Sequence, residues 1–259
     1  MQSKFLAVGA LVPWLEVKVG AIATQAWMNV AHGSNGLALL REGRSAQETI
    51  DQLVENDTDR DNRQLGIVDR LGRAATFTGG ACLPWAGGRA GEGYAAQGNM
   101  LVSADTLAAL TLSFETSAGR PLAERLLMAL DSAQSTGGDR RGQQAAALKV
   151  VAPGSGYGGC DIVVDLRVDD SQQPVSELAR LYELHQLYFG STPEEEWVSS
   201  NAQLQSELAA ALATLGYASG DFAKDLDTWA GTENFEERVN GTERLDPVVI
   251  EQLRTRRAL

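Results

Sequence analysis

The sequence predicts a mixed α+β fold followed by a small all-α C-terminal region. Short runs rich in glycine, valine and aromatic residues dominate the first hundred residues and are typical of strands. The segments that follow begin with helices, because their leucines recur at helical spacing. After the linker-like stretch Asp170 to Pro174 the chain becomes acidic, with 15 Asp and Glu against 7 Lys and Arg over residues 171–259. We therefore expect one domain over residues 1–170 and a helical region over residues 175–259.

The elements expected before residue 80 are two core strands, a helical pair and a hairpin. The capping-box pattern of Ser45 and Glu48 starts the second helix. The turn over residues 69–73 joins the two strands of the hairpin. The predicted ranges are 5–12 and 17–24 for the core strands, 37–44 and from 45 onward for the helices, and 65–68 and 74–78 for the hairpin.

The stretch from Glu92 to Leu101, EGYAAQGNML, separates the strand-rich part from the helices. Its tyrosine and small residues suit a buried strand, and Ser103 is the candidate N-cap of the next helix. Gln97 and Asn99 then lie at a strand end, where amide side chains can donate and accept hydrogen bonds toward a cleft. The alternative interpretation is that both amides only satisfy local backbone groups.

The second half of the first domain is predicted to contain two helices and then two strands. The helices cover residues 106–116 and the segment that opens at Pro121, and the strands cover residues 145–152 and 161–169. In the acidic tail, leucine stripes predict further helices. Gly216 is expected just after one of these helices, and Asp246-Pro247 predicts the N-cap and first residue of the last.

Composition and charge exclude several classes of function. A net charge of -12 argues against a surface for nucleic acid or an anionic membrane, because both would repel the chain. Cys82 and Cys160 belong to no CxxC motif, which indicates free thiols and argues against a zinc site. No window reaches the roughly 18 apolar residues of a membrane span, and Pro13 and Glu16 interrupt the apolar N-terminal run. We expect a cytoplasmic protein without a metal or cofactor.

Two segments resemble ligand-binding motifs, but each lacks a feature that its motif requires. The glycine loop over residues 154–159 precedes a strand, whereas a phosphate-binding loop opens a helix. Asp57, Asp59 and Asp61 resemble the start of a calcium loop, but Asn62 occupies the position that needs glycine. The glycine loop is better interpreted as a mobile hairpin loop between two strands, and the aspartate segment as a solvated turn.

The two histidines, His32 and His185, lie in segments that belong to different predicted domains. A Ser-His-Asp triad or a two-histidine metal site is therefore not expected. His185 shares a stripe with apolar residues and is expected to pack, whereas His32, beside Gly33, could reach a cleft. A hydrolase built from this chain needs a nucleophile whose base is not histidine, such as a Thr, Ser or Cys activated by its own N-terminal amine.

The densest polar cluster is GDRRGQQ, over residues 138–144, ahead of an apolar strand. Arg140 and Arg141 offer planar, bidentate recognition of a carboxylate. Asp139 can orient one of the arginines or bind a substrate amine. The alternative is a solvated turn.

Several segments together resemble a known family. These segments are QSKFLAVG with VPW, VGAIATQAW, RQLGIVD, the TGxxC-PWAG pattern over residues 78–87, GEGYAAQGNML and GGDRRGQQAAAL. In this order, across residues 1 to about 170, they resemble a bacterial domain of unknown function in the N-terminal-nucleophile (Ntn) hydrolase superfamily. The tail segment LGYASGDFAKDLDTWAGTENFEER is similar to a peptidoglycan-binding helical module that some members carry.

The resemblance implies a four-layer αββα sandwich and an amide hydrolase of unknown substrate. Members of the family usually begin with one more short strand, which carries a Thr or Ser after the initiator methionine. This strand has no counterpart before Gln2, so we expect either a truncated sequence, which we prefer, or a copy that has lost catalysis. Ser3 could serve as the nucleophile only if processing exposed it.

By this resemblance, the remaining site residues have expected roles. Lys4 would lower the pKa of the nucleophile, and Asn99 would polarise the developing oxyanion. The expected substrate is a small amide or an amino-acid-like molecule, with peptidoglycan fragments as a further partner. The residues expected to bind the substrate are Thr24, Gln25, Gln97, Asp139, Arg140 and Arg141.

Two alternative hypotheses about the function of the chain remain. The first is a non-catalytic binding or scaffold protein that carries the peptidoglycan-binding-like module. The second treats the tail only as a packing or oligomerisation element, which its leucine stripes would serve equally well. A homodimer is compatible with all of these readings.

Overall fold

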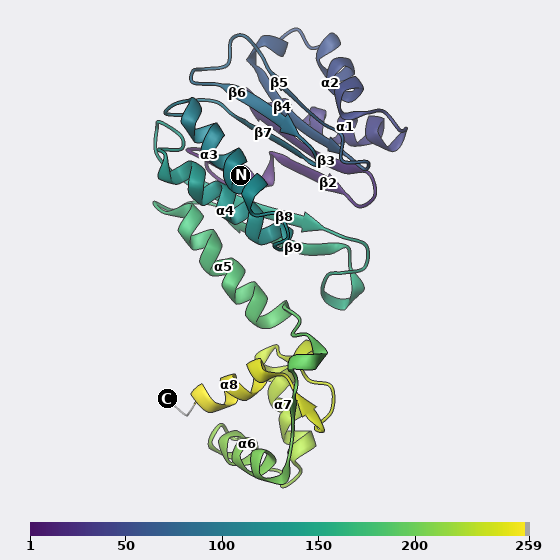
Figure 1. Ribbon diagram of the computed structural model, residues 1–259, viewed down its shortest axis with the longest axis vertical. Helices are drawn as coiled ribbons and strands as arrows, with labels where there is room; N and C mark the ends of the chain where they lie inside the picture. Colours follow the sequence, from purple (N-terminus) through teal and green to yellow (C-terminus); the bar gives the residue numbers. More distant parts are fainter. Residues whose placement is uncertain (257–259) are drawn as a thin grey trace. The chain divides into compact units, whose positions relative to one another are not determined.

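A computed structural model describes residues 1–256 as parts of two compact units, unit 1 (Met1–Leu181) and unit 2 (Tyr182–Leu259) (Figure 1). The strands are β1 (Gln2–Ser3), β2 (Pro13–Glu16), β3 (Gly20–Ala26), β4 (Arg63–Asp69), β5 (Ala74–Thr78), β6 (Gly87–Gly91), β7 (Tyr94–Gly98), β8 (Ala145–Val151), β9 (Ile162–Val168), β10 (Val198–Ser199) and β11 (Arg244–Leu245). The α-helices are α1 (Ala31–Arg41), α2 (Ala46–Glu55), α3 (Ala104–Thr116), α4 (Leu122–Ser135), α5 (Pro174–Phe189), α6 (Ala202–Thr214), α7 (Phe222–Glu233) and α8 (Pro247–Thr255). Residues of α5 belong to both units.

The largest sheet of unit 1 is antiparallel, with the strand order β2-β3-β4-β5. Helices α1 and α2 cover one face of it, as Figure 1 shows. Ile22, Leu65 and Ile67 of the sheet pack against Leu40 and Ile50 of the helices. All five side chains are buried, so their removal from water drives this contact.

The rest of unit 1 contains two smaller sheets and a second helical pair. Strands β6 and β7 form a ribbon that contacts β4 and β5, and β1, β8 and β9 form a separate antiparallel sheet. Helix α3 packs on α4 and on the ribbon, and α4 also contacts β8. Tyr94, Leu107 and Phe114 are buried in the core between the ribbon and the helices. The predicted α+β class is confirmed, and the finer αββα description stays a prediction.

The predicted strand over residues 5–12 is wrong. This segment is irregular, with a short 3-10 helix over Val8–Ala10 and a positive φ of 52° at Ala7. Gly9 packs against β8 so closely that a Cβ atom would lie 2.4 Å from the Cβ of Ala147. The Pro13-Trp14 pair, predicted as a separator, lies within β2. Tertiary packing therefore overrides the strand propensity of this apolar run.

Most other elements of unit 1 follow the sequence patterns. Helix α2 has the full capping box of Ser45 and Glu48, and Ser103 caps α3. The hairpin β4–β5 and the antiparallel pair β8–β9 form as predicted. Helix α1 instead begins at Ala31, ahead of the predicted start at Leu37. The glycines in its first turns weaken the helical pattern of the sequence, so the start was not predicted. Gly33 makes room for the Trp14 ring, which would lie 2.3 Å from a Cβ atom at this position.

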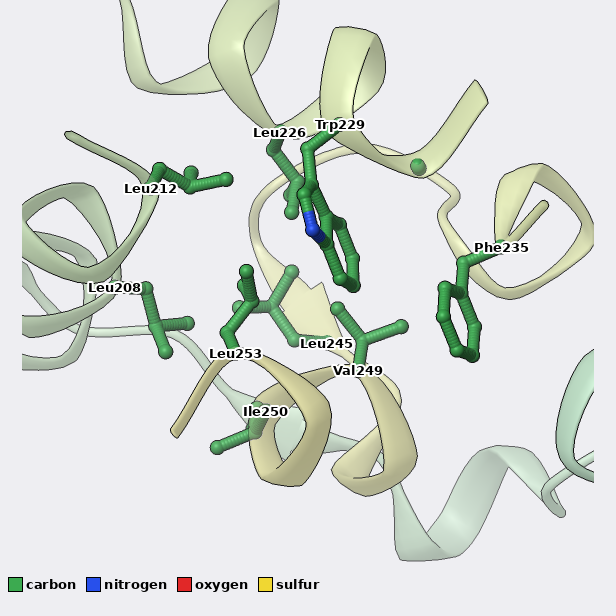
Figure 2. Close-up of a cluster of buried hydrophobic side chains, with 10 residues drawn as sticks. Leu208, Leu212, Leu226, Trp229, Phe235, Leu245, Val249, Ile250 and Leu253 are labelled. Atoms are coloured by element: carbon green, nitrogen blue, oxygen red, sulfur yellow. The ribbon is translucent and has the colours of Figure 1, made fainter. Parts of the chain in front are cut away.

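Unit 2 is a helical module around one apolar core (Figure 2). Leu208 and Leu212 of α6, Leu226 of α7 and Leu253 of α8 are completely buried in it. The rings of Trp229 and Phe235 stack with their centroids 5.2 Å apart. Asp246 caps α8 and Pro247 follows at its first turn, as predicted.

The expectation that this region is all-α is wrong. Val198 and Ser199 pair with Arg244 and Leu245 in a short antiparallel ribbon, β10–β11. Two-residue strands contain no detectable alternation, so no sequence pattern announces them. The helices nevertheless make up most of the ordered elements of unit 2.

A buried ion pair ties the segments of unit 2 together. Arg238 Nη1 donates to Asp246 Oδ2 at 2.7 Å, and the two side chains are 5% and 1% exposed. Arg238 Nε donates to the carbonyl of Leu187 at 2.6 Å, and Nη1 also donates to Thr192 Oγ1 at 3.2 Å.

Within residues 1–256, none of the helices is long and apolar enough to cross a membrane.

Candidate functional site

The candidate site is a cavity of about 580 Å³ within unit 1. Its size falls in the range of small-molecule sites in proteins, about 300–1,000 Å³. Apolar side chains form most of its wall, and a smaller polar group forms the rest. Five of the residues predicted from the sequence line it: Gln25, Gln97, Asn99, Asp139 and Arg141.

Gln64 of β4 organises the amide side chains beside this cavity. It is fully buried, and its Oε1 accepts hydrogen bonds from Gln25 Nε2 at 2.9 Å and Asn99 Nδ2 at 3.0 Å. Its Nε2 donates to Thr78 Oγ1 at 3.0 Å and to the carbonyls of Gly87 and Gly98 at 3.2 and 2.8 Å. Gln64 therefore fixes the amides of β3 and of the loop after β7 in one arrangement.

Gln97 completes this group, which we call the amide cluster (Gln25, Gln64, Gln97 and Asn99). Its Nε2 donates to Gln25 Oε1 at a long 3.4 Å, and its buried Oε1 has no hydrogen-bond partner among the described residues. Gly66 of β4 makes the necessary room, because a Cβ atom there would lie 2.0 Å from Gln97 Oε1. An unpaired buried carbonyl costs about 1–3 kcal/mol, so a rearrangement of Gln97 that gave this oxygen an N–H donor would be stabilising.

Asp139 and Arg141 form the charged part of the site. Arg141 Nε and Nη2 donate to the two Asp139 oxygens at 2.9 and 2.6 Å, and the backbone N–H of Lys4 donates to Oδ2 at 3.2 Å. Burial alone would raise the pKa of Asp139, but these bonds, with the Arg141 backbone N–H, hold it below its ordinary value. Asp139 is 6% exposed, whereas the Arg141 side chain is 38% exposed.

Three predicted site residues do not line the cavity. Thr24 is buried, and its hydroxyl donates to the carbonyl of Asn29 at 3.2 Å. Lys4 Nζ donates to the carbonyl of Gln143 at 3.3 Å on the surface. Arg140 is exposed, and its backbone N–H donates to the carbonyl of Met100 at 2.8 Å. The structure therefore separates Arg140 from Arg141, which the sequence could not distinguish.

A second polar cluster supports the cavity wall from behind. His32 Nε2 lies 3.2 Å from Asp57 Oδ2, and Arg63 Nε donates to the same oxygen at 2.8 Å. Burial lowers the pKa of His32, and the hydrogen bond from Arg63 lowers the pKa of Asp57 to about 2. Arg63 Nη1 also donates to the carbonyl of Trp27, whose side chain lines the cavity.

None of His32, Asp57 and Arg63 lines the cavity, and the acidic residues of this cluster serve a structural purpose. Asp57 and Asp59, which resembled the start of a calcium loop, both pair with Arg63. Within residues 1–256, no group of three or more His, Cys, Asp or Glu side chains could hold a metal ion.

Sequence reasoning missed Gln64 and Cys82 as members of the site. The signal for Gln64 is a single amide within the apolar strand RQLGIVD, which predicts a buried side chain in need of partners. Cys82 lines the cavity, and its Sγ lies 3.3 Å from the carbonyl of Arg63. Burial raises the pKa of its thiol, so the nucleophilic thiolate is disfavoured.

Comparisons with known proteins identify relatives of both parts of the chain. The model described as "Family of unknown function (DUF1028)" matches residues 1–178, and the one described as "Putative peptidoglycan binding domain" matches residues 188–253. The crystal structure of a protein from Silicibacter pomeroyi, described with the same DUF1028 model, is 29% identical with a TM-score of 0.64. The similarity covers 74% of this chain and 82% of that chain. The curated proteins contain no match.

Proposed function

We propose that this chain, which belongs to the family of unknown function DUF1028, binds a small amide in the cavity of unit 1 and hydrolyses it as an Ntn-type amide hydrolase. The amide cluster is the observation that carries this proposal. Its side chains present the same donors and acceptors as an amide bond, so a substrate amide can replace their mutual contacts without loss of hydrogen bonds.

Asn99 is the proposed oxyanion donor. One N–H of its Nδ2 group donates to Gln64 Oε1, and this bond orients the amide at the cavity wall. An amide nitrogen has two N–H groups, so a second donor is available for the oxygen that becomes negative in the transition state. Gln25 and Gln97 are proposed to hold the substrate amide.

The nucleophile in this mechanism is a Thr, Ser or Cys whose own α-amine acts as the base. In the family that the chain resembles, this residue lies on a strand ahead of the segment that corresponds to the run from Gln2. Ser3, Thr106 and Cys82 carry the hydroxyls and the thiol of the cavity wall with matching chemistry. Ser3 lies 3.5 Å from Arg141 Nη2, and processing that exposed its amine would make it a candidate. Lys4 is proposed to support the nucleophile through its positive charge.

The test is amine release from a panel of small amides by the protein expressed from its native locus, with its mature N-terminal residue identified by intact-protein mass spectrometry. We expect turnover that falls by about 100-fold or more in Asn99→Ala, as for the loss of an oxyanion donor in other hydrolases. Asn35→Ala, at an exposed position of α1, is the matched control. Equal turnover in the two variants would remove Asn99 from the mechanism. Saturable binding of amides without any turnover would favour a non-catalytic binding protein.

We also propose that unit 2 binds peptidoglycan. This second function assumes that the chain is divided into two domains and that unit 2 is one of them. The match of residues 188–253 to a peptidoglycan-binding family supports it. The test is co-sedimentation of the full chain with insoluble peptidoglycan. We expect pelleting that soluble muropeptides reverse. A chain that stays in the supernatant at low salt would end this proposal.

A further inference from the structure

The cavity contains three kinds of surface that together describe one class of ligand. Arg141 is the only cationic side chain among the described residues that line it, and Asp139 is the only anionic one. Three members of the amide cluster, Gln25, Gln97 and Asn99, line the same cavity, and apolar side chains make up most of the remaining wall. This inference rests on the proposed function, because it names the substrate class of the same cavity.

Arg141 is prepared to bind a carboxylate. Asp139 holds Nε and Nη2 and thereby fixes the plane of the guanidinium. No hydrogen bond among the described residues uses Nη1, and the side chain is 38% exposed. A fixed guanidinium with free donors recognises a carboxylate at low entropic cost.

Asp139, in contrast, is not available to a ligand. Both of its oxygens accept hydrogen bonds from Arg141, and Oδ2 also accepts the backbone N–H of Lys4. A ligand with a free ammonium group would therefore find no acidic partner among the described residues of the cavity wall. Burial of an unpaired ammonium is costly, so the cavity favours a ligand whose nitrogen is acylated.

The rim of the cavity is apolar and open to water. Phe5, Trp27, Val30 and Leu83 line the cavity and are 45%, 76%, 40% and 54% exposed. Trp27 is held in place, because its backbone N–H donates to the carbonyl of Asn62 at 3.1 Å and its carbonyl accepts from Arg63. Exposed apolar side chains that surround a pocket gain free energy when a ligand covers them.

We propose that the ligand is an N-acyl amino acid with an apolar acyl chain. Its carboxylate pairs with Arg141, its secondary amide lies at Gln25, Gln97 and Asn99, and its acyl chain covers the rim. Gln97 Oε1, which has no hydrogen-bond partner among the described residues, accepts the amide N–H of the ligand once the side chain turns from Gly66 toward the cavity. Free amino acids and peptides with a free ammonium group are excluded by the same geometry.

The decisive experiment is calorimetric titration of the full chain with N-octanoylglycine, N-octanoylglycinamide and octanoate. We expect N-octanoylglycine to bind at least about tenfold more tightly than its carboxamide, because a hydrogen bond to a charged group is lost. We also expect it to bind more tightly than octanoate, which lacks the amide. The comparison uses the unaltered protein, so it does not depend on the folding of a variant.

Variants then assign the contacts. Arg141→Gln should remove the preference for the acid over the carboxamide, whereas Arg140→Gln, outside the cavity, should keep it. Trp27→Ala should weaken binding of N-octanoylglycine but not of N-acetylglycine, with the exposed Leu71→Ala as control.

The outcomes separate this inference from the proposed function. Equal affinity for the acid and the carboxamide would overturn the carboxylate site and leave an amide site in place. Equal affinity for octanoate and N-octanoylglycine would show that the amide is not recognised, and the proposed function would fail with it. Absence of binding for every probe would overturn N-acyl amino acids as the substrate class. The proposed function would then still be tested by amine release from other amides.

Discussion

Each unit contains an arginine held by a buried aspartate, but the two pairs have different surroundings. In unit 2, Arg238 is 5% exposed and donates to a carboxylate, a hydroxyl and the carbonyls of Gln186 and Leu187. In unit 1, the Arg141 side chain is 38% exposed, and its Nη1 makes no hydrogen bond with the described residues. A saturated pair therefore holds a fold together, whereas a pair with unused donors at a cavity is suited to a ligand.

The largest expected effect is on unit 2. Arg238→Gln leaves Asp246 buried without its counter-charge, which costs about 3–5 kcal/mol in comparable pairs. We expect unit 2 to lose most of its stability, measured by urea unfolding and by hydrogen exchange in α8. Asp227→Ala, at an exposed position of α7, is the control. A loss below about 1 kcal/mol would mean that the pair does not hold this unit together.

A smaller effect is expected from Gly66→Ala in unit 1. The added Cβ atom would lie 2.0 Å from Gln97 Oε1, so the amide of Gln97 has to move. Overpacking of this kind costs about 1–3 kcal/mol, and binding in the cavity should weaken as well. Gly80→Ala, where a Cβ atom meets nothing within 4 Å, is the control. Unchanged unfolding and binding in Gly66→Ala would show that the amide cluster tolerates rearrangement.

The comparison predicts a modest stability loss for Arg141→Gln. Water can reach the position of the guanidinium, and Asp139 keeps the backbone N–H groups of Lys4 and Arg141. We expect a loss of about 1–2 kcal/mol in unit 1, measured by the same urea unfolding. A loss as large as that of Arg238→Gln would contradict the distinction between a structural and a ligand-directed pair.

The smallest expected effect depends on pH. Burial lowers the pKa of His32 below its unfolded value, so the unfolded state binds the proton more readily. The free energy of unfolding of unit 1 should therefore decrease as the pH falls below about 6.5. Asp57, with a pKa of about 2, loses its contribution only between about pH 4 and 2.

Hydrogen exchange in α1 and α2 at pH 7 and pH 5 measures the effect of His32. The difference between the two pH values, after correction for intrinsic exchange, should be smaller in His32→Gln than in the unaltered chain. His185→Gln, in unit 2, is the control. An identical difference in all three proteins would rule out His32 as its source.

Local sequence patterns predicted the elements with strong periodicity and clear caps. Gln97 and Asn99 were found because a strand end next to glycine is visible in one short stretch. Gln64 was missed because its role arises from cross-strand partners, with Gln25 on one side and Thr78 on the other. Such contacts depend on register, which no single strand reveals.

The charged part of the site also depends on contacts between segments that are distant in the sequence. Asp139, Arg140 and Arg141 were all proposed from the turn that they share. Tertiary contacts of this turn distinguish the two arginines, because Lys4 donates to Asp139 and the Arg140 backbone N–H donates to Met100, both far away in sequence. The wrong strand over residues 5–12 has a related cause, because the packing of Gly9 on Ala147 is a tertiary contact that local propensity does not contain.

The hydrogen bonds of Gln64 also make it a natural spectroscopic reporter. Its side-chain amide is fully buried and donates to acceptors from β5 and from both strands of the β6–β7 ribbon. The two amide protons should therefore exchange slowly with solvent and give resolved, well-dispersed nuclear magnetic resonance signals. A ligand that draws Gln25 or Asn99 away from Gln64 Oε1 would shift these signals. Occupancy of the cavity can thus be followed without a label on the ligand and without any turnover.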